Sequence, residues 1–165
     1  MSDLLGAAEI RSLAASLDLK PTKKLGQNFV VDANTCRKIV KLAQVGDQDI
    51  ALEIGPGLGS LTLALLEVAK KVVAVEIDER LAKQLPITAA GRGFSDDKLI
   101  VINHDAMDLT KLPNNPTVLV ANLPYNISVP VLLTILEHFP TITRGVVMVQ
   151  SEVAQRLAAA PNNKQ

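Results

Sequence analysis

The amino-acid sequence predicts an α/β fold with a doubly wound, mostly parallel sheet. Five short apolar runs rich in Val, Ile and Leu indicate strands that are buried on both faces. Segments with helical spacing separate most of these runs, and strands that alternate with helices predict a parallel sheet with right-handed crossovers. A glycine-rich turn follows the first run, at the carboxyl end of a strand, where sheets of this class bind their ligands.

The elements are justified in chain order by their spacing and their caps. Apolar spacing predicts a leading helix at 3–17, and Asp32 is the expected N-cap of a second helix at 33–44. The later strands are expected at 50–54, 72–76, 99–103, 117–121 and 145–149, and the later helices at 60–69, 79–90, 129–138 and 151–159. We interpret residues 1–165 as one domain, with a helical and basic segment at 1–46 and the sheet core at 47–165.

Composition and charge narrow the class of protein. Of the 165 residues 48% are hydrophobic and 21% are charged, which excludes a disordered or low-complexity chain. Seventeen basic and 17 acidic residues cancel, so the net charge indicates no polyanionic partner. Residues 19–46 carry six basic groups against Asp32 alone, an excess that suits phosphate contact or simply a solvated surface. Aromatic residues make up 2%, fewer than base-stacking proteins usually have.

Cysteine usage and hydropathy bear on the compartment. The single cysteine, Cys36, excludes a disulfide framework, and its spacing with Ile39, Val40 and Ala43 predicts burial in a helix. No apolar run reaches the roughly 18 residues of a membrane span. The N-terminus lacks the pattern of a secretion signal. We therefore predict a cytoplasmic protein without a membrane partner.

Residues at three predicted strand ends suggest a nucleoside site. Gly55, Gly57 and Gly59 form a turn in which a ligand can lie against main-chain atoms, although such turns also use glycine for purely structural reasons. Glu76 ends the second strand, where a carboxylate can accept the hydroxyl protons of a ribose. Asp105 follows the third strand, where it can accept a hydrogen bond from an adenine amino group or simply cap a turn. The three positions together favour the ligand interpretation.

The glycine spacing distinguishes between nucleoside ligands. Dinucleotide sites prefer G-x-G-x-x-G, with a pyrophosphate at the helix N-terminus. The spacing here is G-x-G-x-G with Pro56 inside it, which suits a nucleoside that carries an amino acid. S-adenosylmethionine is the leading candidate, and a nicotinamide dehydrogenase is the alternative class. The sequence has no Cys/His cluster that would predict a metal site.

The segment Asn122–Ser128 follows the fourth predicted strand and contains the only tyrosine. The side-chain oxygen of Asn122 and the main-chain carbonyl of Leu123 can accept the two protons of an exocyclic purine amine, which frees its lone pair for attack. Pro124 fixes the turn without adding a donor, and Tyr125 can stack on an extruded base. Methyl transfer then needs mainly alignment. A proline turn with a tyrosine packed over it is the structural alternative.

These motifs resemble those of the ribosomal RNA adenine N6,N6-dimethyltransferases, and the match is closest to the KsgA/RsmA branch. The residues that carry the resemblance are Lys24–Val30, Glu53–Thr62, Val75–Asp78, His104–Ala106 and Asn122–Ser128. The resemblance implies a Rossmann-like class I methyltransferase domain that uses S-adenosylmethionine, releases S-adenosylhomocysteine and needs no metal. It further implies a cofactor site lined by Asn28, the backbone at Val30, Gly55, Glu76, Asp105 and Asn122.

Members of that branch dimethylate two adjacent adenosines near the 3′ end of 16S ribosomal RNA in the small ribosomal subunit. The resemblance therefore implies this reaction, a role in small-subunit maturation and a monomeric full-length protein. A non-catalytic RNA-binding or ribosome assembly factor is the alternative function on the same scaffold.

The sequence departs from the family pattern at its carboxyl end. The family sheet has seven strands and is followed by a helical domain, whereas five strands are predicted here. We therefore expect a fragment that binds S-adenosylmethionine but methylates RNA poorly. Its strand at 145–149 would present an apolar open edge, which favours self-association.

Overall fold

The computed structural model describes residues 32–149, so the helices expected at 3–17 and 151–159 lie outside the described part. The strands are β1 (Ile50–Ile54), β2 (Lys71–Glu76), β3 (Leu99–Asn103), β4 (Val118–Leu123) and β5 (Arg144–Val149). The α-helices are α3 (Ala33–Leu42), α4 (Ser60–Val68), α5 (Glu79–Gly91) and α6 (Tyr125–His138), with short 3-10 turns η1 (Asp96–Lys98) and η2 (Ala106–Asp108).

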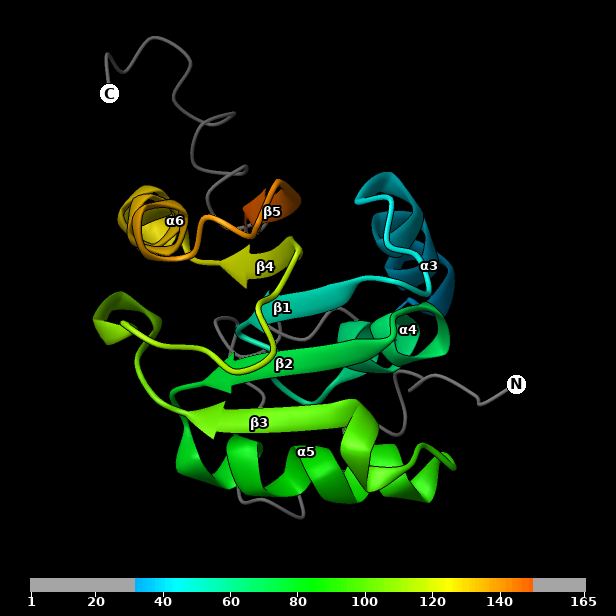
Figure 1. The fold of residues 1–165 in the computed structure, drawn as a ribbon. Helices are drawn as coiled ribbons and strands as arrows, with labels where there is room; N and C mark the ends of the chain where they lie inside the picture. The colour runs from blue at the N-terminus through cyan, green and yellow to red at the C-terminus, as the bar shows by residue number, and fades with distance from the viewer. Residues whose placement is uncertain (1–31, 150–165) are drawn as a thin grey trace, which may run out of the picture.

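The strands form one parallel sheet with the order β3-β2-β1-β4-β5 (Figure 1). From β1 the chain moves outward through β2 to β3, then returns to the other side of β1 with β4 and β5. The direction of winding therefore reverses between β1 and β4, which is where doubly wound sheets open a ligand crevice. The predicted fold class is confirmed for the described residues.

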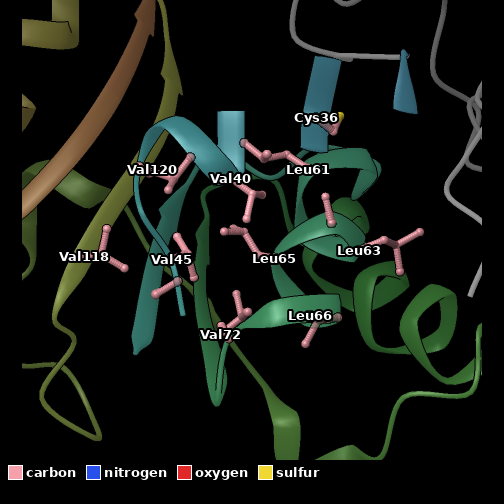
Figure 2. Packing of buried hydrophobic residues seen from close by; sticks show 14 of the residues in the cluster. Cys36, Val40, Val45, Leu61, Leu63, Leu65, Leu66, Val72, Val118 and Val120 are labelled. Atoms are coloured by element: carbon pink, nitrogen blue, oxygen red, sulfur yellow. The ribbon is translucent and has the colours of Figure 1, made fainter. Parts of the chain in front are cut away.

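Apolar clusters cover both faces of the sheet. Ala51, Val72 and Val120 belong to a cluster built with α3, α4 and α5, and Figure 2 shows part of this cluster. Leu52 and Val73, one residue along each strand, face a second cluster built with α6 and the segment around η2. Because successive strand residues point to opposite faces, a strand that is buried on both must be apolar throughout.

Side-chain caps determine where two helices begin. Asp32 accepts a hydrogen bond from the main-chain nitrogen of Asn34 at 2.9 Å, so its predicted role as the N-cap of α3 is confirmed. Asp78 caps α5 in the same way and accepts from the main-chain nitrogen of Arg80 at 2.8 Å. Cys36 lies on the buried face of α3 and is fully buried, as its helical spacing predicted.

The segment Asn122–Ser128 differs from the prediction. Asn122 and Leu123 are the last residues of β4 rather than loop residues, and α6 begins at Tyr125 instead of residue 129. Pro124 is the N-cap of α6 with φ −58°, and a proline at a helix start costs no hydrogen bond because the first N–H groups of a helix have no partner within it. The expected turn is therefore a direct passage from strand to helix.

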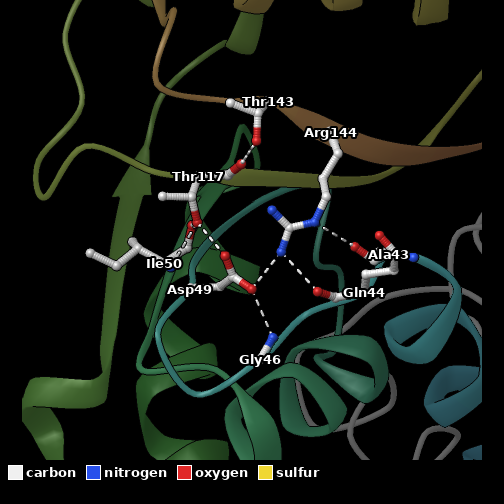
Figure 3. A network of polar contacts seen from close by, with 8 residues as sticks. All are labelled: Ala43, Gln44, Gly46, Asp49, Ile50, Thr117, Thr143 and Arg144. Atoms are coloured by element: carbon white, nitrogen blue, oxygen red, sulfur yellow. Dashed lines mark hydrogen bonds and ion pairs between the residues drawn. The ribbon is translucent and has the colours of Figure 1, made fainter.

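A polar network ties the amino ends of the strands together (Figure 3). Arg144, at the start of β5, forms an ion pair with Asp49 at 2.5 Å and donates to the carbonyl oxygen of Gln44 at 2.8 Å. Asp49 also accepts from the hydroxyl of Thr117 at 2.8 Å and from the main-chain nitrogen of Gly46 at 2.8 Å. The network lies at the amino ends of the strands, whereas the ligand crevice is expected at their carboxyl ends. Within residues 32–149 no helix is both long and apolar enough to cross a membrane.

Candidate functional site

A cavity of about 300 Å³ opens at the carboxyl ends of the central strands. It is bounded by the ends of β1, β2 and β4, the loop after β3 and the beginnings of α5 and α6. Its lining residues are Ile54, Gly55, Gly57, Val75, Glu76, Ile77, Asp78, Leu81, His104, Asp105, Ala106, Asn122, Leu123, Pro124, Ile127 and Val131. The cavity thus lies at the reversal of the strand order, and most predicted site residues within 32–149 line it.

The glycine turn adopts conformations that other residues rarely accept. Gly55 and Gly57 have φ of 75° and 59° and both line the cavity. A Cβ atom on Gly55 would lie 3.0 Å from the carbonyl oxygen of Asn122, so glycine allows the two strand ends to approach. Gly59, with φ of 101°, is the N-cap of α4 and does not line the cavity; a Cβ there would lie 2.6 Å from Leu85 Cδ1.

Glu76 is held in place by the main chain around it. Its Oε1 accepts from the nitrogen of Gly57 at 3.1 Å, and its Oε2 accepts from the nitrogen of Asp78 at 2.9 Å. Burial raises the pKa of Glu76, while these two hydrogen bonds act in the opposite direction. The side chain is only 6% exposed, yet it lines the cavity. A carboxylate has about four acceptor positions, so both oxygens can accept further hydrogen bonds from a ligand.

Asp105 caps a turn and also lines the cavity. It is the N-cap of η2, where its Oδ1 accepts from the main-chain nitrogen of Met107 at 2.9 Å. It also lines the cavity beside His104, which is exposed. Its contact with a ligand stays a prediction.

The remaining predicted residues fall into two groups. Asn122, Leu123 and Pro124 line the cavity, and Tyr125 is the first residue of α6 directly beside them in sequence. Asn28 and Val30 lie outside the described residues. The end of β4 is therefore next to the glycine turn.

Sequence reasoning missed several apolar residues of the wall. Ile77 follows Glu76 and is 67% exposed while lining the cavity, and Ile127 from α6 lines another part of it. An isoleucine directly after a strand-ending acid, outside any helical apolar face, was the available signal for Ile77. Ile127 had no such signal, because the segment around it was expected to be a loop.

The charge of the lining residues is negative. Glu76, Asp78 and Asp105 contribute carboxylates, and no Lys or Arg is among the lining residues described. Such a lining favours a cationic or neutral ligand over an anionic pyrophosphate. Within residues 32–149 no group of three or more His, Cys, Asp or Glu side chains is placed to hold a metal ion.

A second carboxyl lies behind the glycine turn. Glu53, on β1, is 2% exposed and accepts a hydrogen bond from the hydroxyl of Thr62 on α4. Burial raises its pKa to about 8, and the charge of Glu76 adds to the increase while the Thr62 hydroxyl opposes it. Burial, with the charge of Glu53 adding to it, also raises the pKa of the Cys36 thiol to about 12. The hydrogen bond between Glu53 and Thr62 connects β1 to α4 on either side of the glycine turn.

Comparisons with known proteins place this chain in a family. The family model "Ribosomal RNA adenine dimethylase" matches residues 19–165. The "Ribosomal RNA small subunit methyltransferase A" of Streptomyces griseus is 61% identical over 163 residues, which are 98% of this chain and 56% of that protein. The chain thus spans a little over half the length of this curated relative.

Two solved structures show the same architecture. A dimethyladenosine transferase from Plasmodium falciparum has a TM-score of 0.64 at 35% identity, over 77% of this chain and 45% of that one. The 23S rRNA methyltransferase ErmE has a TM-score of 0.64 at 33% identity, over 77% and 50%. Both agree with a Rossmann-like methyltransferase fold. From the match over residues 19–165 and the identity to its relatives, the chain belongs to the ribosomal RNA adenine dimethylase family.

Proposed function

We propose that this chain forms the S-adenosylmethionine-binding part of an enzyme that dimethylates adenine N6 in small-subunit ribosomal RNA. The observation that carries the proposal is the placement of Glu76 and the Asn122–Pro124 segment around one acidic cavity at the strand-order reversal. The family match and the name of the Streptomyces griseus relative support the choice of substrate class.

The lining residues fit this cofactor. Glu76 offers carboxylate oxygens to the ribose hydroxyls, and the exposed side chain of Ile77 offers an apolar surface to a flat adenine ring. The glycine turn leaves the main chain of Gly55 and Gly57 open to the amino-acid part. When bound, the cofactor supplies an electrophilic methyl group on a cationic sulfonium, and the negative lining at Asp78 and Asp105 favours that charge over a pyrophosphate.

The substrate part of the site prepares the nucleophile. The amino group of adenine is a poor nucleophile because its lone pair is delocalised into the ring. The side-chain oxygen of Asn122 and the carbonyl oxygen of Leu123 accept hydrogen bonds from its two N–H groups and so draw the nitrogen towards tetrahedral geometry. Asn122 is neutral, so it positions the amine without acting as a base. Pro124 keeps the strand-to-helix passage rigid, and Tyr125 stacks on the flipped base.

At finer detail, we propose that the full-length protein is monomeric in the cytoplasm and dimethylates two adjacent adenosines near the 3′ end of 16S ribosomal RNA during small-subunit maturation. The 165-residue chain itself is expected to bind the cofactor but to methylate poorly. In the described part β5 is an edge strand, which supports the proposal that the chain self-associates there.

Isothermal titration calorimetry tests the cofactor class directly. The chain is expected to bind S-adenosylmethionine and S-adenosylhomocysteine and not NAD. Binding of NAD without binding of the sulfonium cofactor would overturn the proposal in favour of the dehydrogenase class.

Methyl transfer tests the reaction. Small ribosomal subunits that lack dimethyladenosine would be incubated with labelled S-adenosylmethionine, and N6,N6-dimethyladenosine would be measured by mass spectrometry. We expect slow dimethylation by the wild-type chain, none by Asn122→Ala, and wild-type behaviour by Gln48→Ala, an exposed amide in the loop before β1. Full turnover by this chain would contradict its expected low methylation activity. Subunit binding with no transfer, even by the full-length relative, would favour the assembly-factor alternative.

A further inference from the structure

Asn103 links the ends of two strands through its side-chain amide. It is the last residue of β3 and pairs in register with Glu76 at the end of β2. Its Nδ2 donates to the carbonyl oxygen of Glu76 at 2.9 Å and to that of Ile77 at 3.1 Å. One amide group thus holds two consecutive carbonyls of the neighbouring strand end.

Those two carbonyls belong to the residues that form one wall of the cavity. Glu76 contributes the buried carboxylate, and Ile77 contributes the largely exposed apolar side chain. The carbonyl of Glu76 also accepts from the main-chain nitrogen of His104 at 3.2 Å. This carbonyl therefore accepts two hydrogen bonds, one from the end of β3 and one from the loop after it. Asn103 itself does not line the cavity.

A side-chain amide suits this position. Its NH₂ group supplies two donors without a charge, which matches two adjacent carbonyls. An aspartate of the same shape has no donor when ionised and would place negative oxygens against both carbonyls. Asn103 is exposed, so water can replace its hydrogen bonds when it is removed. The loss therefore affects the direction of the β2–α5 turn more than the stability of the fold.

We propose that Asn103 is a positioning residue for the nucleoside half of the cofactor, and this rests on the proposed function. It acts through Glu76 and Ile77: its two hydrogen bonds set the direction in which the carboxylate meets the ribose and the isoleucine meets the adenine. The hydrogen bonds from Gly57 and Asp78 fix the carboxylate end of the same residue. Main chain and side chain of Glu76 are thus held from three elements.

Cofactor affinity measured by calorimetry tests this inference. Asn103→Asp is expected to weaken S-adenosylmethionine and S-adenosylhomocysteine binding about tenfold, and Asn103→Ala somewhat less. Asn103→Gln keeps the donors and is expected to recover part of the affinity. Gln48→Glu makes the same amide-to-acid change at an exposed position before β1, at the opposite end of the strands from the cavity. This variant is expected to bind the cofactor as the wild type does. Thermal unfolding midpoints of the ligand-free variants are expected to stay close to that of the wild type.

A double-mutant cycle separates positioning from a general structural effect. If Asn103 acts through Glu76, the Asn103→Ala change should lose most of its effect in a Glu76→Ala background. Full additivity of the two changes, or wild-type affinity in both Asn103→Asp and Asn103→Ala, would overturn the inference. Failure of the wild-type chain to bind the cofactor would instead overturn the proposed function, and the inference with it.

Discussion

A Cβ atom on Gly55 would lie 3.0 Å from the carbonyl oxygen of Asn122. The two residues come from β1 and β4, the neighbouring strands between which the winding of the sheet reverses. The proposed cofactor part and the proposed substrate part of the site are therefore in contact through their main chains. The alignment of methyl donor and amine depends on this close approach, since a misplacement of about 1 Å can cost a large factor in rate.

Gly55→Ala is expected to lower the free energy of unfolding by about 1–3 kcal/mol. The new methyl group would meet the Asn122 carbonyl, and φ of 75° strains any residue other than glycine. Urea unfolding measures the loss, and calorimetry should show weaker cofactor binding. Gly91→Ala is the matched control, because a Cβ there has no neighbour within 4 Å. Equal effects of the two substitutions would contradict the explanation.

Glu76→Ala is expected to weaken S-adenosylmethionine binding roughly 10- to 100-fold, because charged hydrogen bonds to the ribose contribute about 1.5–3 kcal/mol. Glu76→Gln should also bind more weakly, since its NH₂ group would face the main-chain N–H of Gly57 or of Asp78. Glu79→Gln, at an exposed position in the first turn of α5, serves as the control. Unchanged affinity in Glu76→Ala would remove Glu76 from the site.

Stability is expected to fall as the pH rises from about 5 to 9 because of Glu53. Burial raises the pKa of Glu53 to about 8 in the folded chain, above the ordinary value of 4.5 in the unfolded chain. The folded state therefore binds more protons over this range, and the contribution of the neutral carboxyl is lost as the pH passes through the folded pKa. One such group changes the free energy of unfolding by at most about 1.4 kcal/mol per pH unit.

Urea unfolding of Glu53→Gln at several pH values checks this assignment. The variant should show a flatter dependence on pH than the wild type, since it carries no ionisable group beside Thr62. Glu137→Gln, exposed near the end of α6, should leave the dependence unchanged. A slope in Glu53→Gln as steep as that of the wild type would show that another group is responsible.

Arg144→Ala is expected to lower the free energy of unfolding by roughly 1–3 kcal/mol. The substitution removes the hydrogen bond to Gln44 and leaves the carboxylate of Asp49, only 15% exposed, without its charged partner. Urea unfolding should show a smaller loss for Lys83→Ala, because the Lys83 side chain and its partner Glu79 are 75% and 69% exposed and such pairs contribute less. The reverse order of the two losses would argue against a stabilising network.

The agreement between sequence and structure is best where one local pattern decides. The bounds of β1 and β3 match the expected strands residue for residue, since short apolar runs between turn residues have the length of strands and are too short for helices. The predicted start of α6 was wrong by four residues: the segment Asn122–Ser128 suggested a proline turn, but a proline is also acceptable at the beginning of a helix. The local pattern allowed both, and packing of α6 on the sheet selected one.

The site residues that follow the apolar strands could be predicted from the sequence, whereas the residues that position them from a neighbouring strand could not. Glycines, Glu76 and Asp105 stand out because they follow apolar strands, where a parallel sheet opens its crevice. Asn103 carries no such signal, because its role comes from the pairing of β3 with β2. Asp105 shows that one side chain can cap a turn and line the cavity together.

The sequence by itself determined the fold class, the positions of the strands and the chemical types available at their carboxyl ends, because each of these depends on residues close together along the chain. The tertiary structure alone decided which ends meet: Gly55 with Asn122, Gly57 with Glu76, and Asn103 with the turn after β2. Strand order and register bring together residues that are 19 to 67 positions apart, and that arrangement arises from burial of both sheet faces rather than from any local pattern.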